Sequence, residues 1–305
     1  MNKKRYHTIY LILHYQVESI TVETISSIHS VDTKGKIVVV DNGSPNKSGL
    51  RLQERFQDID FVDIVISQEN KGFSEGNNYG YEYINSKYEY DFLIATNNDI
   101  KIEQKDFVEK IDELFEDTSF FVAGPDVVEP YSNYHSSPLY ERPAGALEIY
   151  RLSDKWEKEL KEIEKVFSLY EIKRYIGKCK KNNKFVSKAI RLKHFLKGQD
   201  KKYYAYSEGC VLNGAFIIFS SLYCKESDVL FEPLTFMYCE EDILTRECEK
   251  KGWKIVYSPA VQVLHFCEGT SKLYESSYRD FCDKRKRRIK LLLNAYKKYL
   301  DYYKL

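Results

Sequence analysis

The stretch KIVVVDNGSPNKSGLRLQERFQDIDFVDIVIS, residues 36–67, has the pattern of one strand–helix–strand unit. The apolar runs at 36–41 and 61–67 are short and rich in β-branched residues, which predicts two buried strands. Between them, the apolar residues of 47–56 recur at helical spacing. A helix that connects two strands is typical of a parallel sheet, so this stretch predicts an α/β fold.

The same alternation continues on both sides of this unit. Strands are expected at 8–15, 91–96 and 119–125, and helices around Val22, Ile25 and Ile28, at about 75–85 and at about 105–115. Strands that alternate with helices of this length predict a largely parallel, doubly wound sheet with helices on both faces.

The pattern changes in the second half of the chain. Residues 154–202 alternate charged and apolar residues at helical spacing, which predicts a helical insertion. The sheet pattern resumes in GCVLNGAFIIFS (209–220) and KIVYSP (254–259), with an acidic helix start in YCEEDILTRECEKKG (238–252) between them. A basic helix is expected at 278–303.

Composition bounds the class of protein. With 43% hydrophobic and 30% charged residues, the chain has the profile of a soluble globular protein, and its apolar runs fall short of the ~20 residues that span a bilayer. The basic then apolar start MNKKRYHTIYLILHY lacks a small-residue cleavage site, which favours a first strand over a signal peptide. Seven scattered cysteines, an odd number, predict a reducing cytoplasm.

Two basic segments stand against an otherwise acidic chain of net charge +1. Residues 151–205 carry 17 Lys and Arg against 7 Asp and Glu, and residues 278–305 carry 10 against 3. Apolar residues of the final helix repeat at helical spacing: Ile289, Leu292, Leu293, Tyr296 and Leu300. A basic amphipathic helix indicates binding to an anionic membrane surface, here the inner face of the cell membrane. The alternative is that the apolar stripe packs on the rest of the protein while the charges are solvated.

Three polar loops follow strands in the first half. They are Asp41-Asn42-Gly43-Ser44, the glycine-rich ENKGFSEGNNYG at 69–80, and Asn97-Asn98-Asp99. Each one alone is explained by a turn, because Asn, Asp and Gly commonly end strands. Together, at the carboxyl ends of neighbouring strands, they predict a ligand site at one edge of the sheet. The glycine spacing matches neither GxGxxG nor a P-loop, so it specifies neither a dinucleotide nor a Walker-type site.

In their order and spacing, these residues resemble inverting GT-A glycosyltransferases of family 2, in particular the bacterial rhamnosyltransferase and galactofuranosyltransferase group. The resemblance covers residues 6–135 and 205–271. It implies that Asp41 contacts the nucleoside base and that the loop residues Asn70, Gly72 and Asn77 bind the nucleotide-sugar donor. It also implies that the cluster after the next strand is the D-x-D-type motif that binds a divalent metal.

The D-x-D position departs from the family pattern, because Asn97 replaces the first aspartate. The resemblance therefore assigns the metal to Asp99, with Asn97 and Asn98 on the donor and Asn97 a weaker, neutral contact to ribose or metal. It also assigns His265 to the metal shell, although a lone His in VLHF is also typical of a buried core histidine. An oxygen-rich site with one imidazole suits Mn²⁺ or Mg²⁺.

The second half supplies the acceptor side of the resemblance. Gly214, in VLNGAFIIF, matches the position that leaves room for sugar, and Glu240-Glu241 match the family's acidic pair. Glu241 is thereby implied as the catalytic base, with Asp242 as a competing candidate and Glu240 on the acceptor side. Acidic residues at a helix start also complement the helix dipole, which is the alternative explanation for this cluster.

The resemblance therefore implies a metal-dependent inverting glycosyltransferase. It is expected to move a hexosyl or deoxyhexosyl unit from a UDP- or dTDP-sugar to a hydroxyl of a surface glycan carried on a lipid. The expected parts are a nucleotide-sugar-binding half (1–150), a basic helical insertion (151–205), an acceptor and catalytic half (206–277) and a basic C-terminal helix (278–305). The alternatives are a nucleotidyltransferase of similar fold and a nucleic-acid-binding protein that uses the basic segments, although no nucleic-acid partner is expected.

Overall fold

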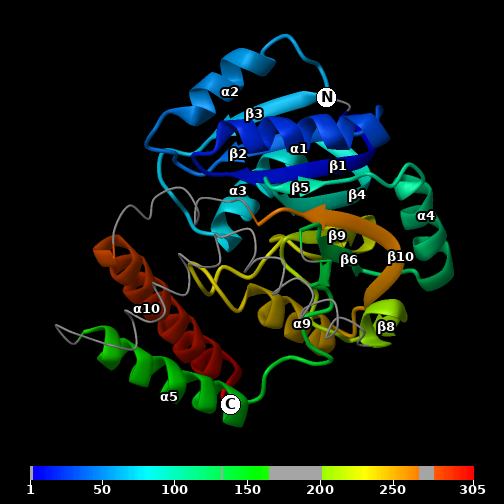
Figure 1. Ribbon diagram of the computed structural model, residues 1–305. Coiled ribbons are helices and arrows are strands. Elements are labelled where there is room, and N and C mark those ends of the chain that lie inside the picture. Colours follow the sequence, from blue (N-terminus) through cyan, green and yellow to red (C-terminus); the bar gives the residue numbers. More distant parts are fainter. Residues whose placement is uncertain (1–2, 132, 165–200, 268–277) are drawn as a thin grey trace.

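The computed structural model describes residues 3–131, 133–164, 201–267 and 278–305. Within these ranges, one mixed sheet of ten strands carries helices on both faces (Figure 1). The main strand order is β3-β2-β1-β4-β9-β6-β10-β5, with β7 paired to β6 and β8 paired to β10. The prediction of an α/β fold with a mostly parallel sheet is thus confirmed.

The strands are β1 (Lys4–His14), β2 (Lys36–Asp41), β3 (Val62–Ile66), β4 (Tyr88–Asn97), β5 (Ile100–Lys101), β6 (Val122–Glu129), β7 (Tyr134–His135), β8 (Ser207–Glu208), β9 (Phe216–Ser220) and β10 (Ile255–His265). The α-helices are α1 (Glu18–Val31), α2 (Ser48–Phe56), α3 (Ser74–Lys87), α4 (Phe107–Thr118), α5 (Ala146–Ile163), α8 (Ser221–Glu226), α9 (Glu240–Lys251) and α10 (Tyr278–Tyr303), and Lys201–Tyr204 forms a 3-10 turn, η1.

The strands β3, β2, β1 and β4 are parallel, as the alternating pattern of the first half predicts. The strand β9 differs, because it lies antiparallel between β4 and β6. Its run Phe216–Ser220 is fully buried on both faces and pairs with Phe92–Thr96 of β4. An apolar run predicts that a strand is buried, and it leaves the strand direction open.

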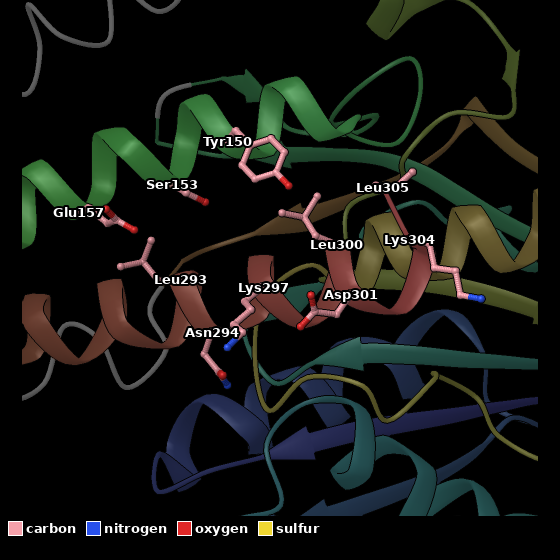
Figure 2. Close-up of a pocket in the computed structure, with 10 residues that line it drawn as sticks. All are labelled: Tyr150, Ser153, Glu157, Leu293, Asn294, Lys297, Leu300, Asp301, Lys304 and Leu305. Carbon is pink, nitrogen blue, oxygen red and sulfur yellow. The ribbon is translucent and has the colours of Figure 1, made fainter.

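The helices α5 and α10 pack side by side, apart from the sheet (Figure 1). Of the predicted apolar stripe of α10, Ile289 and Leu292 are buried, and the other three residues, Leu293, Tyr296 and Leu300, are partly buried. Ala295 and Tyr299 are buried beside them. The stripe therefore packs within the protein, and binding of the charged face of this helix to a membrane surface stays a prediction. A groove of about 730 Å³ lies between α5 and α10, lined by residues such as Tyr150, Lys297 and Leu300 (Figure 2), and no predicted site residue lines it.

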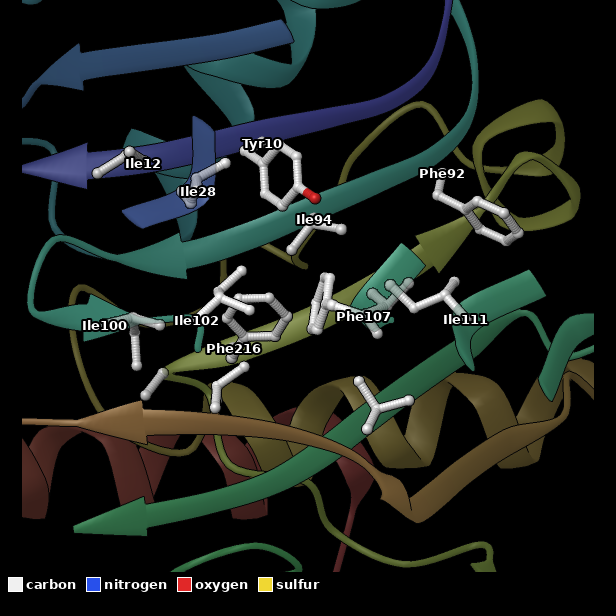
Figure 3. Packing of buried hydrophobic residues seen from close by; sticks show 14 of the residues in the cluster. Tyr10, Ile12, Ile28, Phe92, Ile94, Ile100, Ile102, Phe107, Ile111 and Phe216 are labelled. Carbon is white, nitrogen blue, oxygen red and sulfur yellow. The ribbon is translucent and has the colours of Figure 1, made fainter. Parts of the chain in front are cut away.

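Two apolar cores lie on the two faces of the sheet, because successive strand residues point to opposite sides. Tyr10 and Ile12 of β1 belong to one core, with residues of α1, α2 and α4 (Figure 3). Ile9 and Leu11 belong to the other core, with residues of α3, α8 and α9. This double burial explains why β1 and β2 have continuous rather than alternating apolar runs.

None of the helices in the described ranges has both the length and the apolar character needed to cross a bilayer. The predicted helical insertion is described only in part. Its first portion belongs to α5, which begins at Ala146, and residues 165–200 lie outside the described ranges.

Candidate active site

Three parallel strands reach the same edge of the sheet at polar positions. In the β1–β2 register His14 lies beside Asp41, and in the β1–β4 register Leu13 lies beside Asn97. The loops that follow these strands therefore leave the sheet next to one another. This is the carboxyl edge, where ligands of open α/β sheets bind.

Asn42 organises the glycine-rich loop before α3. Its Nδ2 donates to the Gly72 carbonyl at 2.8 Å, and its Oδ1 accepts from the Lys71 backbone N–H at 2.8 Å. The Asn70 Oδ1 accepts from the Gly72 N–H at 2.9 Å. Gly72 has a φ of +79°, and a Cβ at this position would lie 2.1 Å from the Phe236 carbonyl oxygen. Only glycine fits this conformation and this close approach.

A buried polar chain fixes the loop after β4. Nδ2 of Asn98 donates to Thr21 Oγ1 at 3.0 Å, and the Thr24 hydroxyl donates to the Asn98 carbonyl at 2.6 Å. The His14 ring joins this chain, with 2.6 Å between Nδ1 and Thr21 Oγ1 and 2.8 Å between Nε2 and Ser48 Oγ. Burial lowers the pKa of His14 to about 4, so the ring is neutral at physiological pH. The Asn98 amide thus anchors this loop to α1.

Asp99, in the turn between β4 and β5, and His265, at the end of β10, come together although they are distant in sequence. His265 Nε2 lies 3.2 Å from Asp99 Oδ1, and both side chains are largely buried. Burial lowers the pKa of His265, but the hydrogen bonds to Asp99 and Cys267 outweigh it and raise the pKa to about 10. The structure therefore brings together the two side chains that the sequence assigns to the metal. Among the described residues, no group of three or more His, Cys, Asp or Glu is placed to hold a metal ion.

A cavity of about 420 Å³ opens at this edge. Five of the predicted site residues line it: Asn70, Gly72, Asn97, Asn98 and Asp99. The rest of the lining comprises Leu13, Tyr15, Asn42 and Phe73, the segment Phe236–Tyr238, and Lys284, Arg287, Arg288 and Leu291 of α10. The cavity combines apolar and aromatic side chains with a few polar groups, which is typical of a small-molecule site.

Two predicted donor-binding residues do not line this cavity. Asp41 is buried and accepts a hydrogen bond from the Ser44 N–H at 3.3 Å, and burial raises its pKa. Asn77 is buried in α3, where its Nδ2 donates to the Phe73 carbonyl at 2.9 Å. In this structure both side chains support the loops around the cavity, and their contact with a donor stays a prediction.

The acidic start of α9 places its first three carboxylates in different surroundings. Glu241 is partly buried, and its Oε1 accepts from the Gly214 N–H at 3.3 Å. Burial raises the pKa of Glu241, and the nearby Asp242 charge adds to the shift. Asp242 instead accepts from the Ala144 N–H at 2.7 Å, which ties the segment before α5 to this helix. Burial also raises the pKa of Asp242.

Glu240 points into the protein interior. It is 6% exposed, and its Oε1 has no hydrogen-bond partner among the described residues. Burial raises the pKa of Glu240 to about 8, and the charge of Glu241 contributes to the rise. Burial therefore favours the protonated form of this carboxyl. Its assignment to the acceptor side stays a prediction.

The cations of α10 at the cavity are the site residues that sequence reasoning missed. The basic run 284–288 is evident in the sequence, but a basic amphipathic helix predicts a membrane surface as its partner. The structure instead places Lys284, Arg287 and Arg288 in the wall of the cavity that also contains Asp99. The available signal was the spacing of these three residues, which puts them on one face of a helix.

The fold gives the first indication of the class of protein. The chain has a GT-A-like α/β architecture and resembles a mannosyltransferase from Pyrobaculum calidifontis, PcManGT, whose structure contains GDP-Man and Mn²⁺. The TM-score is 0.53 at 11% identity, and the match covers 98% of this chain and 72% of that one. At this identity the likeness shows the shared fold alone.

The family then follows from the sequence match. Residues 10–191, more than half of the chain, match the model of glycosyl transferase family 2. The chain belongs to this family.

A curated relative matches part of the chain. It is the low-salt glycan biosynthesis hexosyltransferase Agl10 of Haloferax volcanii, 27% identical over 142 residues. The match covers 46% of this chain and 42% of the relative, so the chain aligns with less than half of that protein's length.

Proposed function

We propose that this protein is a metal-dependent inverting glycosyltransferase that moves a hexosyl or deoxyhexosyl unit from a nucleoside diphosphate donor to a hydroxyl of a glycan. The observation that carries the proposal is the cavity at the carboxyl edge, where Asn70, Gly72 and the 97–99 cluster meet. Family membership and a relative named as a hexosyltransferase of glycan biosynthesis support it. The finer predictions are a UDP- or dTDP-linked donor, a lipid-linked surface glycan as acceptor, and a likeness to rhamnosyl- and galactofuranosyltransferases.

Asp99 and His265 are the residues that would hold the metal. A carboxylate and an imidazole 3.2 Å apart fit one Mn²⁺ or Mg²⁺, because these ions commonly take only one or two protein ligands and complete their shell with water and substrate phosphates. The fit therefore does not require a third acidic ligand from the protein. When bound, the ion supplies positive charge next to the departing diphosphate. A neighbouring fold is known with GDP-Man and Mn²⁺, which supports this cofactor class.

Glu241 is proposed as the general base. In the reaction, the acceptor hydroxyl oxygen bonds to the anomeric carbon on the face opposite the diphosphate. The bond from that carbon to the diphosphate oxygen breaks, and the hydroxyl proton passes to the Glu241 carboxylate. A raised pKa brings this carboxylate closer to neutral pH, where a general base is most effective.

The contacts of Asp242 favour Glu241 for this role. The Asp242 carboxylate accepts a hydrogen bond from the Ala144 backbone N–H and lies near Arg246. Arg246 in turn donates a hydrogen bond to the Ala144 carbonyl at 2.8 Å. These interactions give Asp242 a structural function. Glu241, in contrast, contacts the Gly214 N–H, at the position that the family resemblance assigns to the acceptor side.

Gly214→Ala is expected to reduce turnover about tenfold or more with little loss of stability, because small displacements of a reacting group have large kinetic effects. A Cβ at position 214 would lie 2.7 Å from Glu241 Oε1, so the end of this flexible side chain must move. Steady-state kinetics and thermal melting measure the two effects. Gly145→Ala is the matched control, since no atom lies within 4 Å of its Cβ position. Unchanged turnover in Gly214→Ala would show that the Glu241 position is not critical.

The test of the proposed function is a thermal-shift screen of UDP-, dTDP- and GDP-sugars with and without Mn²⁺. A donor at 100 times its Kd stabilises the folded state by about 2.7 kcal/mol. For a domain of this size that corresponds to a rise in melting temperature of roughly 4 °C. The rise is expected with Mn²⁺ and should be much smaller without it. Failure of every donor to shift the melting temperature under either condition would contradict the proposal.

A further inference from the structure

The first turns of α10 contribute three cationic side chains to the cavity. Lys284, Arg287 and Arg288 line it together with residues 97–99, which lie far away in the sequence. Asp99 is the one carboxylate in the described lining of this cavity, and it is paired with His265. The local charge is therefore strongly positive, which favours an anionic ligand.

Lys284 has a feature that a purely structural residue rarely shows. Its Nζ is shielded from solvent and has no hydrogen-bond partner within the described part of the chain. Two other cations of α10 differ, because Arg285 forms an ion pair with Glu159 and Lys298 donates to the Leu234 carbonyl at 3.0 Å. An unpaired buried ammonium group destabilises the folded state, so its presence indicates a partner that arrives from outside.

The helix that carries these cations is firmly held. Tyr299 OH donates to the Ala144 carbonyl at 3.0 Å, and Tyr303 OH donates to Glu247 at 3.0 Å. Ala295 and Tyr299 are buried against α5 and the start of α9. The cations therefore project from a rigid element, which reduces the entropy lost when they bind a ligand.

We propose that α10 forms the cationic wall of the donor cavity and that Lys284, Arg287 and Arg288 bind the diphosphate of the nucleotide sugar. This inference rests on the proposed function, which supplies a donor with a diphosphate. A diphosphate offers several anionic oxygens, and Arg and Lys are the side chains that bind such groups. These residues would hold the diphosphate from the side opposite the strand edge, and the apolar and aromatic lining is left for the nucleoside.

An anionic membrane is a less favourable partner for these three residues. They line a cavity whose opposite wall is the edge of the sheet, and the apolar stripe of their helix is packed inside the protein. The Lys284 ammonium is shielded from solvent, so a flat lipid surface cannot contact it, whereas Arg287 and Arg288 are exposed. Lys290 is exposed on the same helix and does not line the cavity, so it provides a control for charge alone.

The experiment measures binding of UDP, dTDP and GDP and of the matching nucleosides by calorimetry, with Mn²⁺ present. Lys284→Met, Arg287→Ala, Arg288→Ala and the triple variant are compared with wild type and with Lys290→Met. Each single cavity variant is expected to weaken nucleoside diphosphate binding about tenfold, and the triple variant at least a hundredfold, with a weaker dependence on salt. Nucleoside binding and the Lys290→Met variant should be unchanged.

Thermal melting separates ligand binding from a structural role. Because Lys284→Met removes an unpaired buried charge, it is expected to raise the melting temperature of the free protein by about 2–4 °C while it reduces the shift caused by the nucleotide. A structural role predicts the opposite, a lower melting temperature. Lys284→Arg keeps the charge and should restore a large part of the nucleotide affinity.

The outcomes distinguish this inference from the proposed function. If wild type binds a nucleoside diphosphate and the triple variant binds it equally well, the cationic wall is wrong and the proposed function stands. If wild type binds no nucleoside diphosphate, both fail. If the cavity variants lose binding to liposomes of anionic lipid but keep their nucleotide affinity, these residues serve a membrane surface and the inference is overturned.

Discussion

Glu241→Gln is expected to lower turnover by about a hundredfold or more while it leaves the affinity for the donor within about twofold. The amide has the shape of the carboxylate and can still accept the Gly214 N–H, so the fold and the cavity should persist. It cannot accept a proton at neutral pH, and removal of a general base typically costs 10²- to 10⁴-fold in rate. The measurements are kcat with a saturating acceptor and the donor Kd by calorimetry.

Asp242→Asn is the matched control for this variant. An amide oxygen can replace the carboxylate oxygen that accepts the Ala144 N–H, so a modest effect is expected. Near-normal turnover in Glu241→Gln together with an inactive Asp242→Asn would transfer the base to Asp242.

The pH profile gives a second readout for the base. Burial raises the pKa of Glu241, so the carboxylate takes up a proton at a higher pH than an exposed Glu would. Since the base acts in its deprotonated form, kcat/KM is expected to fall as the pH is lowered through this raised pKa. The acidic limb should disappear in Glu241→Gln, whose residual activity does not depend on this proton.

Asp99→Ala is expected to abolish the metal-dependent part of donor binding. The substitution removes the carboxylate of the proposed metal site and leaves His265 as its remaining side chain in the described structure. Without the ion, the diphosphate loses a major counter-charge. Calorimetry with UDP or dTDP, with and without Mn²⁺, measures the difference. Asn97→Asp is the control, because it restores the commoner family residue and should be tolerated.

A folded Asp99→Ala protein with unchanged Mn²⁺-dependent nucleotide affinity would contradict the metal assignment. A loss of affinity that is equal with and without Mn²⁺ would instead indicate a collapsed cavity. Far-UV circular dichroism and the melting temperature verify that the fold is retained.

The local sequence pattern was sufficient to predict most of the helices and strands. The runs at 36–41 and 61–67 are strands as predicted, because each carries β-branched residues that pack on both faces of the sheet. The direction of β9 could not be predicted from the sequence pattern, since an apolar strand of five residues can be buried equally well in either orientation. Strand direction depends on the path of the connecting chain, which no local periodicity encodes.

The candidate site, too, could be predicted from the sequence only in part. The polar loops at 41–44, 69–80 and 97–99 could be predicted to meet because parallel strands end at one edge. The approach of His265 to Asp99 came from the family resemblance, because the order of the strands decides which side chains become neighbours. The arrival of Lys284 at this cavity was not predictable, since it depends on how α10 packs against α5 and α9.

The two walls of the cavity come from segments that lie far apart along the chain, the strand edge before residue 100 and the helix after residue 278. Contacts of such long range form late, because the chain between them must be ordered before they bring any gain. During refolding, circular dichroism reports the helices and the sheet regardless of whether the helix after residue 278 has docked. Recovery of nucleotide affinity reports the docking of that helix, and it should lag behind the return of secondary structure.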